Sequence, residues 1–136
     1  SDLQFAPIVA ARTGIPFTAR MGRDVNGDNR PQNDRPFPAR RNTGIGPNFF
    51  GLDARITKQF WINRESGLRV DFVVESTNLL NKTNFLAVND VIGNDPALVA
   101  GPYNFKGDKR RLSTEALGFT AAADPRRIQF GLRIAF

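Results

Sequence analysis

The side chains best suited to chemistry are the acids and amides in the run DVNGDNRPQND. Asp24, Asn26 and Asp28 alternate along the chain, as the first three side-chain ligands of a calcium loop do, and Asn33 and Asp34 could add late oxygens. The sixth position of such a loop holds Asn29 instead of glycine, and the twelfth holds an arginine instead of glutamate. The pattern predicts a candidate calcium site at Asp24, Asn26, Asp28 and Asp34. The alternative is an Asx-rich turn, in which the same side chains bond their own backbone.

A second group of carboxylates consists of Asp53, Asp71 and Glu75, which strand alternation places on one face of two neighbouring strands. Two such carboxylates could serve as the acid and base of a glycosidase. Arg55 and Arg69 fall on the same face, however, which favours structural ion pairs. The chain has no His and no Cys, so the commonest general base, the commonest zinc ligands and any disulfide are excluded. Any enzymatic chemistry would therefore have to rest on carboxylates, Ser, Thr or Lys alone, and no cofactor other than the candidate calcium is expected.

The charge distribution favours solvated or lumen-facing side chains over a nucleic-acid interface. The 136-residue chain has a formal net charge of +6, with 19 Lys and Arg against 13 Asp and Glu. The basic residues occur singly or in pairs and form no block of the kind that binds nucleic acid, so no nucleic-acid partner is expected. No apolar run approaches the ~20 residues of a membrane-spanning helix, whereas a membrane-spanning strand needs only about 9–11 alternating residues.

The elements that must position these residues are strands. Glycines and prolines interrupt every stretch long enough for a helix, while alternation of apolar and polar residues is frequent. Residues 1–136 are predicted to be a single segment with strands at about 3–19, 48–61, 68–80 and 126–136 and long loops at about 20–47 and 81–125. In the first strand, Pro7, Gly14 and Pro16 predict an edge, a bulge or a bend.

The connections between these strands are unequal. A tight polar turn at residues 61–67 follows the second strand, whereas the other two connections are long. Short turns at one end and long loops at the other are typical of transmembrane barrels. The predicted fold is all-β: an antiparallel meander of about four strands with two long loops, part of a transmembrane-type β-barrel or of a β-sheet assembly.

Two consequences follow for the side chains. The turn should bring Arg55 close to Asp71 or Glu75, because opposite charges across strands contribute roughly 0.2–1 kcal/mol. The apolar positions should all lie on one side of one sheet: Leu52, Ile56, Val70, Phe72, Ile128, Phe130 and Ile134.

Four runs in order resemble the C-terminal end of TonB-dependent outer-membrane receptors. They are GRDVNGDNRPQNDRP, RRNTGIGPNFFGLDARITKQF, LRVDFVVESTNLLNKTNF and AADPRRIQFGLRIAF, and together they span most of the chain. The subgroup that they resemble most is that of the large Oar-like receptors with a carboxypeptidase-regulatory-like N-terminal domain. One departure is Thr77, which stands where that family usually has Phe. The resemblance implies a non-enzymatic receptor or transporter barrel in the outer membrane of a Gram-negative bacterium.

The same resemblance gives a meaning to the last strand. Its apolar residues alternate up to an aromatic, which resembles the signal by which the outer-membrane assembly machinery takes up a barrel: Ile128, Phe130, Leu132, Ile134 and Phe136. The implied partners are therefore that machinery, outer-membrane lipid, and either the rest of a receptor barrel or other copies of the chain.

The family's barrel has about 22 strands, and about eight is the practical minimum for closure. The family also has an N-terminal plug and a TonB-interacting segment, neither of which is expected in these residues. The opening Ser1-Asp2-Leu3 is typical of an internal or processed start. The chain is thus expected to be a piece of a receptor. The alternative is a self-assembling structural β-protein, an extracellular tube or filament subunit derived from such a fragment. A soluble β-sandwich binding module is a third hypothesis.

Overall fold

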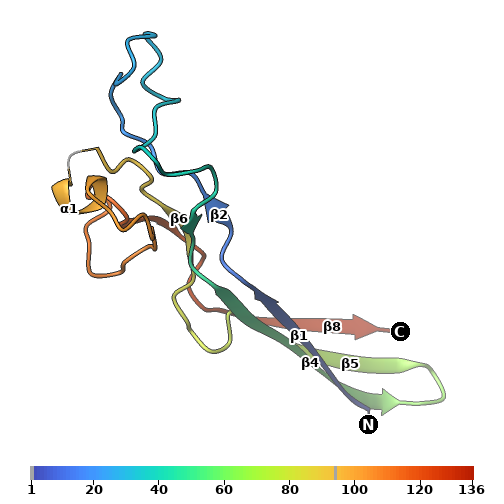
Figure 1. Cartoon of the computed structure of the whole chain (residues 1–136). Coiled ribbons are helices and arrows are strands. Elements are labelled where there is room, and N and C mark those ends of the chain that lie inside the picture. Colours follow the sequence, from blue (N-terminus) through green and yellow to red (C-terminus); the bar gives the residue numbers. More distant parts are fainter. Residues whose placement is uncertain (1, 94) are drawn as a thin grey trace. The chain divides into compact units, whose positions relative to one another are not determined.

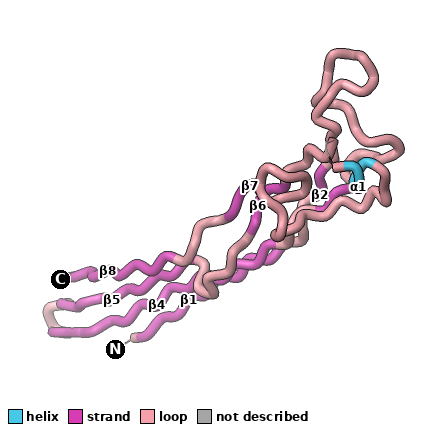
Figure 2. The backbone as a smooth tube through the Cα atoms, turned by 90° about the vertical axis from the view of Figure 1, so that its left-hand side faces the viewer, coloured by secondary structure: helices cyan, strands magenta, loops and turns pink. Residues whose placement is uncertain are grey.

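The computed structural model describes residues 2–93 and 95–136, which form two compact units (Figure 1, Figure 2). The first unit consists of Ser1–Ala11, Phe50–Thr83 and Asp124–Phe136. The second consists of Arg12–Phe49 and Asn84–Ala123. The first unit is built on a β-sheet, and the second is formed by the two long connections between its strands.

The sheet of the first unit has four strands in the order β1-β4-β5-β8. Its strands are β1 (Leu3–Arg12), β4 (Phe49–Asn63), β5 (Leu68–Thr77) and β8 (Arg127–Ala135). β5 pairs antiparallel with both of its neighbours, and β1 and β8 are the edges (Figure 1). The predicted all-β fold with a four-stranded antiparallel meander is confirmed.

Strand alternation sorts the sheet into two faces. Val74 on β5 lies opposite Ile56 on β4 and Phe130 on β8, and Phe72 lies opposite Leu132 on β8. Because directly opposite residues project to the same side, these residues share what we call the apolar face. The predicted one-sided set is confirmed by the register and by alternation along each strand: Leu52, Ile56, Val70, Phe72, Ile128, Phe130 and Ile134.

The other side, the polar face, includes the predicted ion pair. Arg55 lies opposite Glu75, and its Nη1 is 3.2 Å from Glu75 Oε1. Both side chains are about half exposed, so the pair is worth at most about 1 kcal/mol. Asp53 has a different role, because its Oδ1 accepts a hydrogen bond from the backbone N–H of Asn78 at 2.8 Å. The expected register is confirmed.

The turn between β4 and β5 is tighter than predicted. β4 continues to Asn63, which leaves residues 64–67 for the turn itself. The Asn63 side-chain oxygen accepts hydrogen bonds from the N–H groups of Glu65 at 2.9 Å and Ser66 at 3.4 Å. Gly67 has a φ of +77°, a conformation that costs a residue with a Cβ roughly 1–2 kcal/mol. An Asx turn and one glycine therefore close the hairpin.

The first predicted strand is divided in the structure. β1 ends at Arg12, and a separate two-residue strand, β2 (Pro16–Phe17), follows. A Cβ on Gly14 would lie only 1.8 Å from the carbonyl oxygen of Gly46, so the two backbones approach at a distance that requires glycine. The Gly14 N–H also donates to Asn48 Oδ1 at 2.9 Å. This contact turns the chain away from the β1 direction, as the Gly and Pro positions predicted.

The two long connections, predicted only as loops, contain further elements: β3 (Gly44–Ile45), β6 (Phe85–Val88), α1 (Pro96–Val99) and β7 (Phe119–Ala122). β2 pairs with β3, and β6 pairs with β7, both antiparallel. Within the described parts of the chain, no helix is long and apolar enough to cross a membrane.

The second unit has its own hydrophobic core. Ile92 and Phe105 are completely buried, and Ala19 and Leu117 complete the cluster. These residues come from both long connections, which therefore pack against each other. At about 25 cal/mol per Å² of apolar area, this burial is what orders the two connections.

Candidate functional site

The apolar side chains of β8 are largely uncovered. Ile128, Phe130, Leu132 and Ile134 are between 50% and 70% exposed. Contiguous exposed apolar surface of this kind marks contact with a protein or a membrane. Phe136, predicted to lie on this strand, is one residue beyond its end and is 95% exposed. The structure thus brings four of the five predicted terminal-strand residues together on one strand face.

Strands β5 and β8 have the length of membrane-spanning strands, whereas β4 is longer, with 15 residues. β5 has 10 residues and β8 has 9, and a membrane-spanning strand needs about 9–11. Lys58 interrupts the apolar face, but its Nζ lies 5.9 Å from the centre of the Phe60 ring. A lysine can keep its stem on apolar surface while its ammonium reaches a polar layer. The outer edges of β1 and β8 have no partner strand among the described residues.

The polar face holds a nearly buried carboxylate. Asp71 is 5% exposed, and it lies opposite Gln59 on β4 and Arg133 on β8. Its Oδ1 is 3.6 Å from Nε of Arg69, and neither atom has a hydrogen-bond partner among the described residues. The Arg69 guanidinium lies 5.6 Å from the centre of the Trp61 ring. The face therefore has paired charges as well as polar groups, which an aqueous lumen would tolerate and a bilayer would not.

The candidate calcium loop is compact. One carboxylate oxygen from each of Asp24, Asp28 and Asp34 lies within 4.8 Å of the others. Asp34 is buried, whereas Asp24 and Asp28 are exposed. Asn26 belongs to the same loop, and its side-chain oxygen accepts a hydrogen bond from the N–H of Asp28 at 2.9 Å. The loop has the oxygen donors that calcium prefers.

The same side chains also organise their own backbone. Asp24 accepts hydrogen bonds from the N–H groups of Asn29 at 2.8 Å and Gly27 at 2.7 Å. These bonds lower the pKa of Asp24, and the bond from Asn29 has the largest effect. Asp34 Oδ2 accepts from the N–H of Val25 at 2.6 Å. These are the bonds expected of the Asx-rich turn, and calcium binding stays a prediction.

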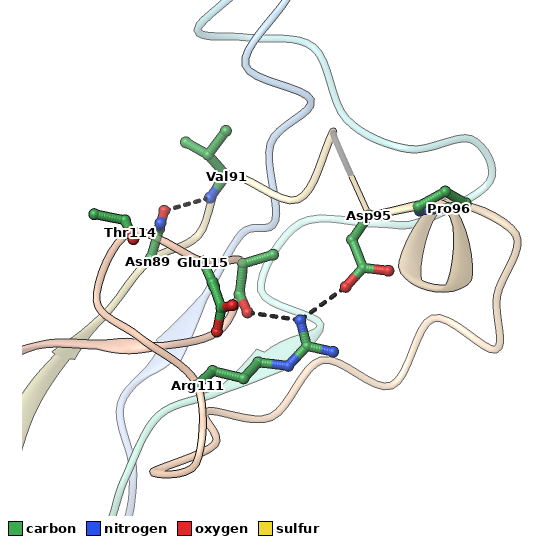
Figure 3. Close-up of a pocket in the computed structure, with 8 residues that line it drawn as sticks. Asn89, Val91, Asp95, Pro96, Arg111, Thr114 and Glu115 are labelled. Carbon is green, nitrogen blue, oxygen red and sulfur yellow. Dashed lines mark hydrogen bonds and ion pairs between the residues drawn. The ribbon is translucent and has the colours of Figure 1, made fainter.

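A cavity of about 610 Å³ lies within the second unit, in a region that the sequence predicted only as a loop (Figure 3). Arg111 is at its wall, and its Nη1 donates to Asp95 Oδ2 at 2.7 Å and to the carbonyl of Ala116 at 3.1 Å. The bond from Arg111 lowers the pKa of Asp95. Asp95 Oδ1 also accepts from the N–H of Ala97 at the start of α1. Arg111 thus links the 108–118 segment to α1.

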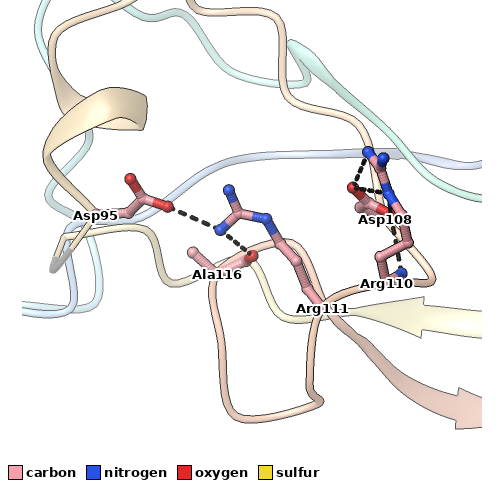
Figure 4. Close-up of polar contacts among 5 residues, drawn as sticks. All are labelled: Asp95, Asp108, Arg110, Arg111 and Ala116. Atoms are coloured by element: carbon pink, nitrogen blue, oxygen red, sulfur yellow. Dashed lines mark hydrogen bonds and ion pairs between the residues drawn. The ribbon is translucent and has the colours of Figure 1, made fainter.

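The neighbouring arginine is directed elsewhere. Arg110 Nη2 lies 2.8 Å from Asp108 Oδ2, and Arg110 Nε also donates to this carboxylate (Figure 4). The bonds from Arg110 lower the pKa of Asp108 to about 2. The sequence shows the Arg110-Arg111 pair, but not that one side chain lines a cavity and the other does not. No signal in the sequence distinguishes them, because the cavity depends on which distant segments meet.

Comparison of the chain with protein-family models, with curated proteins and with solved structures found no match. The resemblance to TonB-dependent receptors therefore stays a prediction. The function must be argued from the two faces of the sheet, its open edges and the ordered connections.

Proposed function

We propose that this chain supplies membrane-spanning strands of a TonB-dependent receptor barrel in the outer membrane of a Gram-negative bacterium. In this role it is a non-enzymatic part of a transport or binding structure. Its strands would contact outer-membrane lipid on one side and an aqueous lumen on the other. The remaining strands would come from the rest of the receptor, and the outer-membrane assembly machinery would insert them.

The observation that carries this proposal is the sorting of β4, β5 and β8 into an exposed apolar face and a polar face. Phe72 and Phe130 lie on the apolar side with ring centres 6.4 Å apart. Asp71 and the Arg55–Glu75 pair lie on the polar side. In a soluble sheet the apolar face would need a covering layer, since leaving it in water forfeits about 25 cal/mol per Å².

The connections support the same arrangement. By the meander order, both long connections leave one end of the sheet, and the 64–67 turn closes the other end. Short turns on the periplasmic side and long loops outside are the pattern of outer-membrane barrels. The independent core of the second unit gives the long connections an ordered structure.

Detergent dependence tests the proposal. In a mild detergent or in phospholipid vesicles the chain should stay folded and dispersed as an oligomer that pairs its open strand edges, because four strands cannot close a barrel. It should aggregate when the detergent is removed. Protease protection of β5 and β8 in vesicles, with cleavage in the long connections, is the expected pattern. A folded, monodisperse 15.1 kDa monomer in detergent-free buffer would contradict it.

A self-assembling extracellular β-protein, forming tubes or filaments, is the second candidate because the sheet has two open edges. An unpaired strand edge offers N–H and C=O groups to another chain. Repeated β8-to-β1 pairing between copies would give a ring if the rotation closes and a filament if it does not. Sedimentation and direct imaging in detergent-free buffer test this candidate. It requires a regular polymer, which Ile128→Pro on β8 should disrupt; dispersed monomer or amorphous aggregate would contradict it.

A further inference from the structure

The cavity of the second unit has the size of a small-molecule site. Its volume of about 610 Å³ falls within the roughly 300–1,000 Å³ of typical ligand pockets. Its wall contains no aromatic side chain among the described residues, and much of it is polar. Val91, Asn89 and Thr114 lie along one side, and Arg111 lies between Glu115 and Asp95 (Figure 3). The cavity therefore suits a hydrophilic solute better than an apolar one.

Arg111 retains donors for a ligand. Both of the hydrogen bonds that it donates to described residues are made through Nη1. Its Nη2 and Nε donate to no acceptor among the described residues, and the side chain is one-third exposed. A guanidinium fork of this kind matches the two oxygens of a carboxylate. Asp95 Oδ2 accepts from Arg111 through Nη1, and Asp95 Oδ1 accepts from the N–H of Ala97.

Glu115 provides a separate negative charge at the same cavity. Its Oε2 accepts a hydrogen bond from the N–H of Leu112 at 2.8 Å, which fixes the carboxylate. Its Oε1 accepts no hydrogen bond from the described residues, and Glu115 belongs to none of their ion pairs. Arg111 and Glu115 therefore line one cavity without neutralising each other.

We propose that this cavity binds a small zwitterion of the amino-acid type, free or as a short peptide. The ligand's carboxylate is held by Nη2 and Nε of Arg111, and its ammonium by Oε1 of Glu115. The hydroxyl of Thr114, which also lines the cavity, is available to polar groups between the two charged ends of the ligand. Arg111, Asp95 and Glu115 give the cavity a net negative charge, which disfavours a purely anionic ligand. A purely cationic ligand would leave the remaining donors of Arg111 without an acceptor, so a molecule with both charged groups fits best.

This inference is independent of the membrane proposal, since every residue involved belongs to the second unit. It would survive if the chain proved to be a soluble or a self-assembling protein. Its test can be made on the whole chain in either detergent or buffer, whichever keeps it folded.

The experiment is a titration followed by NMR, with diglycine as the probe. N-acetyl-diglycine, which lacks the ammonium, and diglycine amide, which lacks the carboxylate, are the matched ligands. Diglycine should shift the amide signals of Arg111 and Glu115 saturably. Each blocked ligand should bind at least about tenfold more weakly, because each loses one charge-assisted hydrogen bond.

Glu115→Gln is the decisive variant, because a glutamine oxygen can still accept from Leu112 and the loop should stay folded. It should weaken diglycine about tenfold and abolish the difference between diglycine and its N-acetyl form. Arg110→Gln, which changes the adjacent arginine outside the cavity, should leave diglycine binding unchanged. Equal binding of the three ligands would overturn the proposal. The proposal would also be overturned if about 50 mM diglycine caused no saturable shift, because a specific site should have a dissociation constant far below this concentration.

Discussion

Replacing Phe130 by arginine distinguishes a lipid-facing sheet from a water-facing one by how much the free energy of unfolding falls. Phe130 lies near the middle of the nine-residue β8, opposite Val74, and is 70% exposed. An arginine facing lipid near the bilayer midplane costs roughly 2–4 kcal/mol, which is about a 30- to 700-fold loss in the folding equilibrium. In water, the same change at so exposed a position should stay within about 0.5 kcal/mol.

The adjacent residue supplies the control. Gln129 lies on the polar face, opposite Glu75. Gln129→Arg adds the same side chain to the same strand, beside a carboxylate that already pairs with Arg55. The expected change is at most about 1 kcal/mol, favourable if the new arginine shares the carboxylate.

The assay is urea-dependent folding in phosphatidylcholine vesicles, followed by the fluorescence of Trp61, the only tryptophan in the chain. We expect Phe130→Arg to lower the urea midpoint or prevent insertion, and Gln129→Arg to behave like the unchanged protein. Equal behaviour of the two variants would refute the assignment of the apolar face to lipid. A large loss for Gln129→Arg alone would mean that the two faces are reversed.

Three further predictions concern single residues. Ser76→Ala should raise the free energy of unfolding by about 1 kcal/mol in chemical denaturation, because Ser76 is 7% exposed and its hydroxyl finds no hydrogen-bond partner in the described part of the chain. Asp108→Asn should remove an acid-dependent part of the second unit's stability, measured by amide exchange. Because the folded pKa of Asp108 is depressed to about 2 from 3.8, its contribution is present above about pH 4 and is lost as the pH falls towards 2. Calcium, but not magnesium, should slow amide exchange at Val25, and Asp34→Asn should abolish the effect; exchange that ignores calcium would leave the loop an Asx-rich turn.

The sequence alone predicted the sheet because its determinants are local. A period of two places Ile128, Phe130 and Ile134 on one side whatever the partner strand is. The polar turn ending at Gly67 then sets the β4–β5 register, and the charges of Arg55 and Glu75 agree with it. The divided first strand was also visible in advance, as glycine and proline interruptions.

Only the tertiary structure decided how the long connections fold. Arg20 and Asp90 form an ion pair at 2.6 Å although 70 residues separate them, and Ile92 and Phe105 are buried in a core shared by both connections. Such contacts leave no period in the sequence, because the segments are short and irregular and their partners are distant. The cavity likewise lies between segments that are separated in the sequence, residues 89–96 and 111–116. Arg111 lines the cavity and donates to Asp95, which the fold brings near from an earlier segment, whereas Arg110 pairs with Asp108 in its own segment.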